Sequence, residues 1–152
     1  MSIEVLNSVL TFNNISWIAF GVLLGYIVGV IPGLGKGTAV AVSIPITFYL
    51  SPLTGIAYLI GIAKGSTAGS AVSAILLNTP GEPSSAPTAL DGYPLSQKGQ
   101  ASKALKMGLF ASVIGDFFAT LLLIFLAAPL AEYALLFGPV EVTSILLFSL
   151  TF

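Results

Sequence analysis

Two lysines lie in otherwise apolar sequence, and each is surrounded by glycines and other small residues. Lys36 belongs to PGLGKG (residues 32–37), and Lys64 begins KGSTAGS (residues 64–70). If each segment interrupts a helix, the helix that follows presents unpaired backbone N–H groups and the positive end of its dipole. A lysine beside such an end adds a full positive charge. The sequence therefore predicts an anion-binding site where the two interruptions meet.

The predicted site combines backbone amides, hydroxyl groups and the two lysines, and it extends into the polar segment that follows. Its substrate-binding residues are predicted to be Gly33, Gly35, Lys36, Gly37, Lys64, Gly65, Ser66, Thr67, Gly69, Ser70, Asn78, Pro80 and Gly81. The alternative for each lysine is a position at the membrane surface, where the long side chain extends its ammonium group to the lipid headgroups.

A third candidate is Asp116, within the long apolar segment Ala101–Ala128. It lies ten residues after Lys106, or about 15 Å along a helix, and hence near the middle of a bilayer. A carboxylate at that depth is a functional candidate, and Lys36 or Lys64 would be its partner. Asp116 and Asn78 are therefore predicted as candidates for ion coupling. The alternative for Asp116 is a structural ion pair or a protonated, hydrogen-bonded acid between helices.

The composition indicates whether these residues lie in water or in a membrane. Of the 152 residues, 56% are hydrophobic and 7% are charged, against about 25% charged residues in soluble domains. We therefore predict an all-α integral membrane protein. The five basic and six acidic residues nearly balance, which argues against a nucleic-acid partner. The chain has no cysteine and no histidine, so disulfides, thiolate metal sites and imidazole relays are excluded, and no metal or cofactor is expected beyond a coupling cation, Na⁺ or H⁺.

The chain is predicted to have two regions. Residues 1–16 are expected to form an amphipathic helix in the membrane interface, and residues 17–152 a membrane transport domain. The first deep helix, Trp17–Ile31, would measure about 22 Å, which is shorter than the hydrocarbon core of about 30 Å. The interruption after it should therefore lie in the membrane. Glycines recur at every fourth position of this helix and predict close approach of another helix: Gly21, Gly25 and Gly29.

Short helices are predicted on both sides of each interruption. After the first interruption, a short helix is expected over Thr38–Leu50. A second pair of short helices is expected over residues 56–63 and 71–78, with the break at 64–70. Such pairs are typical of the discontinuous helices of secondary transporters. The predicted fold is therefore a set of transmembrane helices with discontinuous or re-entrant helical hairpins, followed by a cytoplasmic polar loop over residues 79–100.

Lysines predict the orientation in the membrane. Lys98, Lys103 and Lys106 cluster before the long apolar segment, which places this end in the cytoplasm by the positive-inside rule. If the short helices form hairpins, or if all four cross, the beginning of the chain is also cytoplasmic. A single broken helix counted as one span reverses that assignment. The chain ends within an apolar run, residues 146–152, which suggests a fragment of a longer protein.

The sequence resembles the amino-terminal third of the large membrane subunit of tripartite tricarboxylate transporters. The resemblance rests on PGLG at Pro32–Gly35, on ILLNTPGEPSS followed by TALDGYP within Ile75–Pro94, and on LLFGPVE near the end. It covers nearly the whole chain from about Gly21 onward. Lys36 stands where the family commonly has proline, Ala63 and Lys64 stand where two tyrosines are usual, and Ala71 is a smaller difference.

The resemblance implies uptake of di- or tricarboxylate anions across the bacterial cytoplasmic (inner) membrane by a multi-pass secondary active symporter. It implies a periplasmic solute-binding protein and a small membrane subunit as partners. It also implies that this chain supplies one half of an inverted-repeat transporter and is not an enzyme. The alternative is a structural or assembly subunit of the membrane without a binding site. An intramembrane enzyme is the weakest reading, since Ser66 or Ser70 beside Lys64 would be the only dyad.

Overall fold

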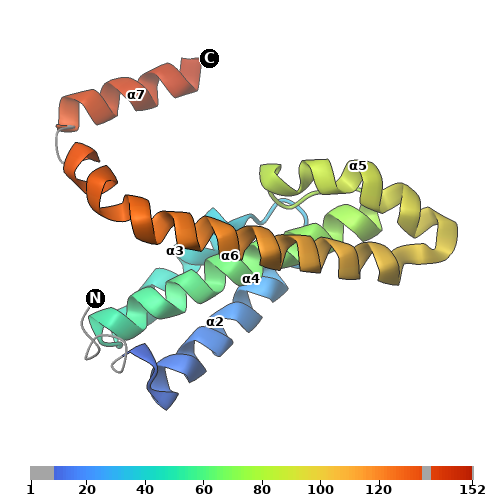
Figure 1. Cartoon of the computed structure of the whole chain (residues 1–152), viewed down its shortest axis with the longest axis horizontal. Coiled ribbons are helices and arrows are strands. Elements are labelled where there is room, and N and C mark those ends of the chain that lie inside the picture. The colour runs from blue at the N-terminus through green and yellow to red at the C-terminus, as the bar shows by residue number, and fades with distance from the viewer. Residues whose placement is uncertain (1–8, 135–137, 152) are drawn as a thin grey trace. The chain divides into compact units, whose positions relative to one another are not determined.

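The computed structural model describes residues 9–134 and 138–151, and these residues form helices joined by turns, with no strand among them (Figure 1). The chain divides into two compact units, residues 1–111 and 112–152. Among these described residues, three helical segments are long and apolar enough to cross a membrane. The predicted all-α membrane fold is thus confirmed. The elements in chain order are α2 Phe12–Val30, α3 Lys36–Thr47, α4 Pro52–Leu77, η1 Pro83–Ser85, α5 Ala86–Leu95, η2 Ser96–Gln100, α6 Ala101–Ala134 and α7 Pro139–Thr151.

Helix α2 begins earlier than the apolar pattern predicts. The Thr11 side chain accepts a hydrogen bond from the backbone N–H of Asn14 and so caps the helix at Phe12. With 19 residues, α2 measures about 28 Å and not 22 Å, so it nearly matches the hydrocarbon core. Residues 12–16 therefore belong to α2. The rest of the predicted interfacial helix (residues 1–16) falls mostly on residues 1–8, which lie outside the described part of the chain.

The first predicted interruption is confirmed. Helix α2 ends at Val30, and α3 begins at Lys36 with Gly35 in the capping position. Between them Gly33 has a φ of +84°, a left-handed conformation that suits glycine and lets the chain reverse. Because Gly35 has no side chain, it cannot cap the helix that it precedes. The first N–H groups of α3 therefore need an acceptor from elsewhere in the chain.

Helix α4 starts beside the start of α2. The Ser51 side chain caps α4 by accepting from the N–H of Thr54, and Pro52 occupies the first turn, where no N–H is required. The buried Thr54 hydroxyl then donates to the side-chain carbonyl of Asn14 at 2.6 Å. This hydrogen bond fixes the two helix beginnings at the same level.

The second predicted interruption is wrong, because α4 is continuous over 26 residues and passes through Lys64–Ser70 without a break. Its glycines make room for α2 instead of breaking the helix. A Cβ atom added at Gly61, Gly65 or Gly69 would lie 2.1–2.6 Å from a backbone carbonyl oxygen of α2. Their N–H groups are within a continuous helix, so these glycines do not form the second predicted set of free amides.

The glycines of α2 pack in the same way against α4. A Cβ atom at each would lie 2.1–2.5 Å from the carbonyl oxygen of its α4 neighbour, in the pairs Gly21 with Tyr58, Gly25 with Ile62 and Gly29 with Ser66. The numbers rise together on the two helices, so α2 and α4 run parallel. Helix α3 and the turn after it lead the chain back from the end of α2 to the start of α4; α3 is the cyan segment of Figure 1.

This pairing places the start of α2 and the end of α4 at opposite ends of the first unit. Because α4 starts level with Asn14 and runs parallel to α2, its end at Leu77 lies at the opposite end of the first unit from Phe12. Figure 1 shows the start of α2 and the turn at residues 96–100 at opposite ends of this unit. If the lysine-rich end is cytoplasmic, the start of α2 faces the other side. The expectation that both lie on one side is not supported.

Residues 79–100 are mostly helical, and the prediction of a polar loop is wrong in this respect. Pro83 and Pro87 lie in first-turn positions of η1 and α5, where proline favours a helix over a loop. Gly99, with a φ of +76°, then allows the reversal into α6. The side of the membrane on which this segment lies stays a prediction.

The second unit contains the later part of α6, and α7. Helix α6 extends to Ala134, beyond the predicted end at Ala128. Its described apolar side chains from Leu109 onward are exposed, including Phe110 and Phe125. This pattern suits a helix whose surface meets lipid or further protein.

Candidate functional site

A carboxylate supplies the acceptor that α3 needs. Glu82 is 4% exposed, and its Oε1 atom accepts a hydrogen bond of 2.9 Å from the backbone N–H of Lys36, the first residue of α3. The Lys36 ammonium group lies 3.9 Å from Oε2. The N-terminus of α3 therefore binds a negative group with both its backbone and its side chain, as the PGLGKG pattern predicts.

Hydroxyl groups of α4 surround the same carboxylate. The Ser66 hydroxyl donates to Oε1 at 3.1 Å, and the Thr67 hydroxyl lies 3.5 Å from Oε2 while also bonding the Ala63 carbonyl at 3.1 Å. The Ser84 hydroxyl donates to Oε2 at 3.3 Å. A buried charge is costly unless hydrogen bonds replace its hydration. These donors from α3, α4 and η1 provide that replacement.

The backbone around Glu82 is held by a second set of hydroxyls. The N–H of Glu82 donates to Ser70 Oγ at 2.8 Å, and Ser70 is hydrogen-bonded to Ser85, both side chains being buried. Gly81 fits tightly here, because an added Cβ atom would lie 3.0 Å from the carbonyl oxygen of Gly29 and 3.2 Å from Ser70 Oγ. The segment before η1 is thus pressed against α2 and α4, which positions the carboxylate.

The site opens into a pocket of about 460 Å³ beside the N-terminus of α3. Small-ligand pockets typically measure about 300–1,000 Å³, so a small carboxylate would fit. Within residues 9–134 and 138–151, no three acidic side chains come together in a way that could hold a metal ion. The lining residues are Gly35, Lys36, Gly37, Glu82, Pro83 and Ser84.

The depth of this site follows from α4. Ser66 lies twelve residues after Thr54, or about 18 Å along the helix from the level where α2 and α4 begin. A hydrocarbon core of about 30 Å would include that level. If the hydrocarbon core begins at the level of Thr54, Glu82 is a carboxylate within it, and such residues are functional candidates.

The structure gathers part of the predicted set around Glu82 and gives other members different positions. Gly35, Lys36, Gly37, Ser66, Thr67, Ser70 and Gly81 lie at or beside the carboxylate. Gly65 and Gly69 lie in the contact between α2 and α4.

The remaining predicted residues lie elsewhere. Gly33 lies in a turn, Pro80 lies in the non-helical segment after α4, and Asn78 caps the end of α4 in a left-handed conformation with a φ of 56°. Lys64 is exposed on α4, and Asp116 is exposed in the second unit. The pairing of Asp116 with a lysine stays a prediction. The roles of Asp116 and Asn78 in ion coupling also stay predictions.

Glu82 itself was not among the predicted site residues. The pattern that could have identified it is the acid in PGEPSS, within a polar segment that follows two cationic glycine-rich segments. From the sequence alone, the positive groups are predicted to bind a substrate. A buried helix end with a cation first requires an acceptor from the protein's own chain.

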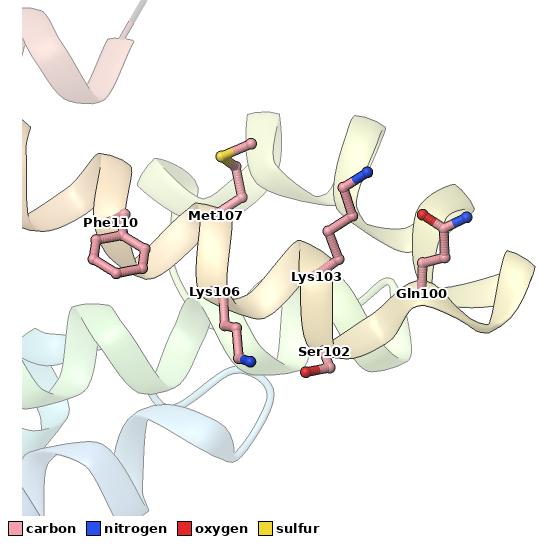
Figure 2. A pocket seen from close by; sticks show the side chains of 6 residues that line it. All are labelled: Gln100, Ser102, Lys103, Lys106, Met107 and Phe110. Carbon is pink, nitrogen blue, oxygen red and sulfur yellow. The ribbon is translucent and has the colours of Figure 1, made fainter.

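A second pocket, of about 510 Å³, lies along the first turns of α6. It is lined by Gln100, Ser102, Lys103, Lys106, Met107 and Phe110 (Figure 2). In Figure 2 the ammonium groups of Lys103 and Lys106 point away from each other across the helix. The two charges do not converge on a common ligand position, unlike the donors around Glu82.

Comparison with known proteins matches one family model and one curated relative. The family model described as the tripartite tricarboxylate transporter TctA family matches residues 15–152. An uncharacterised 52.8 kDa protein in the TAR-I ttuC′ 3′ region of Agrobacterium vitis is 46% identical over 141 residues. That similarity covers 93% of this chain and 28% of the relative, so the chain spans less than a third of the relative's length. No solved structure matches the chain.

Proposed function

The chain belongs to the tripartite tricarboxylate transporter TctA family, and from this premise we propose that it is part of a permease subunit that carries di- or tricarboxylate anions. The permease lies in the bacterial cytoplasmic membrane and takes up its substrate with a periplasmic solute-binding protein and a small membrane subunit. Transport is driven by a cation gradient, of Na⁺ or H⁺.

The observation that supports carboxylate binding is the arrangement of donors at the N-terminus of α3. The Lys36 N–H, the Lys36 ammonium group and the Ser66 hydroxyl converge on one carboxylate, that of Glu82. A substrate carboxylate needs the same kinds of donors in the same partly desolvated surroundings. The pocket beside Glu82 gives such a group a route to them.

The fold supports a transport role for this position. Helix α3 has 12 residues, or about 18 Å, and leads the chain back from the interruption after Val30 towards the level where α2 and α4 begin. Discontinuous helices of this kind form the substrate sites of secondary transporters near the middle of the membrane. Asp116 and Asn78 are the proposed coupling residues.

The experiment is uptake of labelled citrate and succinate by the full-length protein, reconstituted in liposomes with both partner proteins and with the binding protein saturating. Lys36→Met removes the ammonium group and keeps the apolar stem. Because this side chain is 58% exposed, we expect the low end of a charged hydrogen bond, a loss of apparent affinity of about 10-fold.

The matched control is Lys98→Met, at an exposed lysine in η2 that lies outside the pocket; it should leave the affinity unchanged. Equal affinities for Lys36→Met and the wild type would remove Lys36 from the site. Absence of both uptake and binding in the wild type would favour the alternative, a structural or assembly subunit of the membrane.

A further inference from the structure

We propose that Glu82 is a built-in competitor of the substrate: its carboxylate occupies the place of a substrate carboxylate, and transport requires its displacement. This inference rests on the proposed function, because it names the group that a transported carboxylate must replace. The supporting geometry is independent of the family, since it consists of the contacts that the carboxylate makes.

The first step of the argument is that the donors are already engaged. The Lys36 N–H and the Ser66 hydroxyl both donate to Oε1, and the Ser84 hydroxyl donates to Oε2. A hydroxyl group has one proton, so it cannot donate fully to two carboxylates at once. A substrate carboxylate and Glu82 therefore exclude each other at these donors.

The second step is that Glu82 can move toward open space. It follows the end of α4 at Leu77 by five residues, and those between are not helical. Glu82, Ser84 and Lys36 also line the pocket of about 460 Å³. The carboxylate thus needs a side-chain movement rather than the unfolding of a helix to leave its donors.

The third step concerns what the competition achieves. When no substrate is bound, Glu82 accepts from the buried Ser66 hydroxyl, which would otherwise lack a hydrogen-bond acceptor. When a substrate is bound, the displaced carboxylate opposes it and favours its release. Solutes without a carboxylate cannot replace Glu82, so the same residue selects anions. An apparent affinity falls in proportion to the fraction of molecules whose site is free.

The test is binding of labelled citrate, succinate and acetate to the purified full-length protein, with uptake measured in parallel. Glu82→Gln keeps the size of the side chain and removes the competing charge. We expect it to bind the best of these carboxylates about 10-fold tighter or more, and to transport it more slowly because release is hindered. Asp91→Asn, at an exposed acid of α5 outside the pocket, is the matched control and should change neither quantity.

A structural role for Glu82 predicts the opposite sign. If the Glu82 carboxylate only holds α3 against α4, Glu82→Gln loosens the site and binds the added carboxylate ligand equally well or more weakly. That result overturns the inference, whereas uptake by the wild type still supports the proposed function. If the Gln variant does not fold, Glu82→Asp decides: its carboxylate is one methylene shorter and competes less well, so tighter binding supports the inference and unchanged or weaker binding overturns it. A wild-type protein that neither binds nor transports any of the three ends both proposals.

Discussion

The contact between α2 and α4 has a testable consequence at Gly25. An added Cβ atom at this position would lie 2.1 Å from the Ile62 carbonyl oxygen and 2.8 Å from the Ile62 Cα and carbonyl carbon. All three are backbone atoms of α4, so no side-chain rotation can relieve the clash. Ordinary carbon–oxygen contacts begin at about 3.3 Å. In Gly25→Ala the two helices must therefore separate locally by about 1 Å.

The cost of this separation follows from the packing that it opens. A gap of about 0.5–1 Å removes a quarter to a half of the dispersion attraction between facing atoms, and overpacked sites typically lose about 1–3 kcal/mol. Alanine recovers up to about 1 kcal/mol through its better helix propensity. Since the clash at Gly25 is with backbone, we expect a net loss of about 2 kcal/mol.

The assay is thermal unfolding of the full-length protein in detergent, followed by gel filtration of the heated samples. Gly115→Ala is the matched control, because this glycine lies in α6 and an added Cβ atom there meets nothing within 4 Å. It should be neutral or slightly stabilising, whereas Gly25→Ala should lower the melting temperature by several degrees. Equal melting temperatures for the two variants would refute the close parallel packing of α2 and α4.

Two further predictions concern orientation and coupling. With the lysine-rich end in the cytoplasm, a cysteine introduced by Gln97→Cys should be labelled only from inside and one introduced by Asn13→Cys only from outside; labelling of both from one side would contradict the parallel arrangement. If Asp116 couples transport to the cation gradient, Asp116→Asn should abolish gradient-driven uptake while the protein stays in the membrane. Uptake close to that of the wild type would assign Asp116 to helix packing.

The sequence predicted the first interruption correctly and the second wrongly, although both segments contain glycine and lysine. The difference lies in proline and spacing. Pro32 and Gly33 end a helix because proline lacks an N–H and Gly33 takes a positive φ. In contrast, Gly61, Gly65 and Gly69 recur every four residues, which is the pattern of a helix face that another helix approaches. In α2 the pattern lies in apolar sequence and predicts packing, whereas in α4 polar residues around Lys64 accompany it and favour a break.

The topology depended on this misassigned break. Counting α4 as two short segments added a crossing and placed both ends of the region on one side. One continuous α4 parallel to α2 leaves three passages between Phe12 and Leu77. Local patterns indicate where helices begin and end, but the relative direction of two helices depends on contacts between residues about 40 positions apart, such as the hydrogen bond of Thr54 to Asn14.

The sequence predicts the kinds of groups that form the site, but not that the Glu82 carboxylate occupies it. Lys36 and the hydroxyls of Ser66 and Ser70 were identified from their types, because positive and donor groups in apolar sequence require an anion. Which anion they meet depends on the chain after α4, where Gly81 fits against Gly29 and brings Glu82 back to the level of Ser66. The two parallel glycine-lined helices thus do more than pack. By approaching closely they let a short segment reach the N-terminus of α3, so that a carboxylate of the protein lies where the proposed substrate must bind.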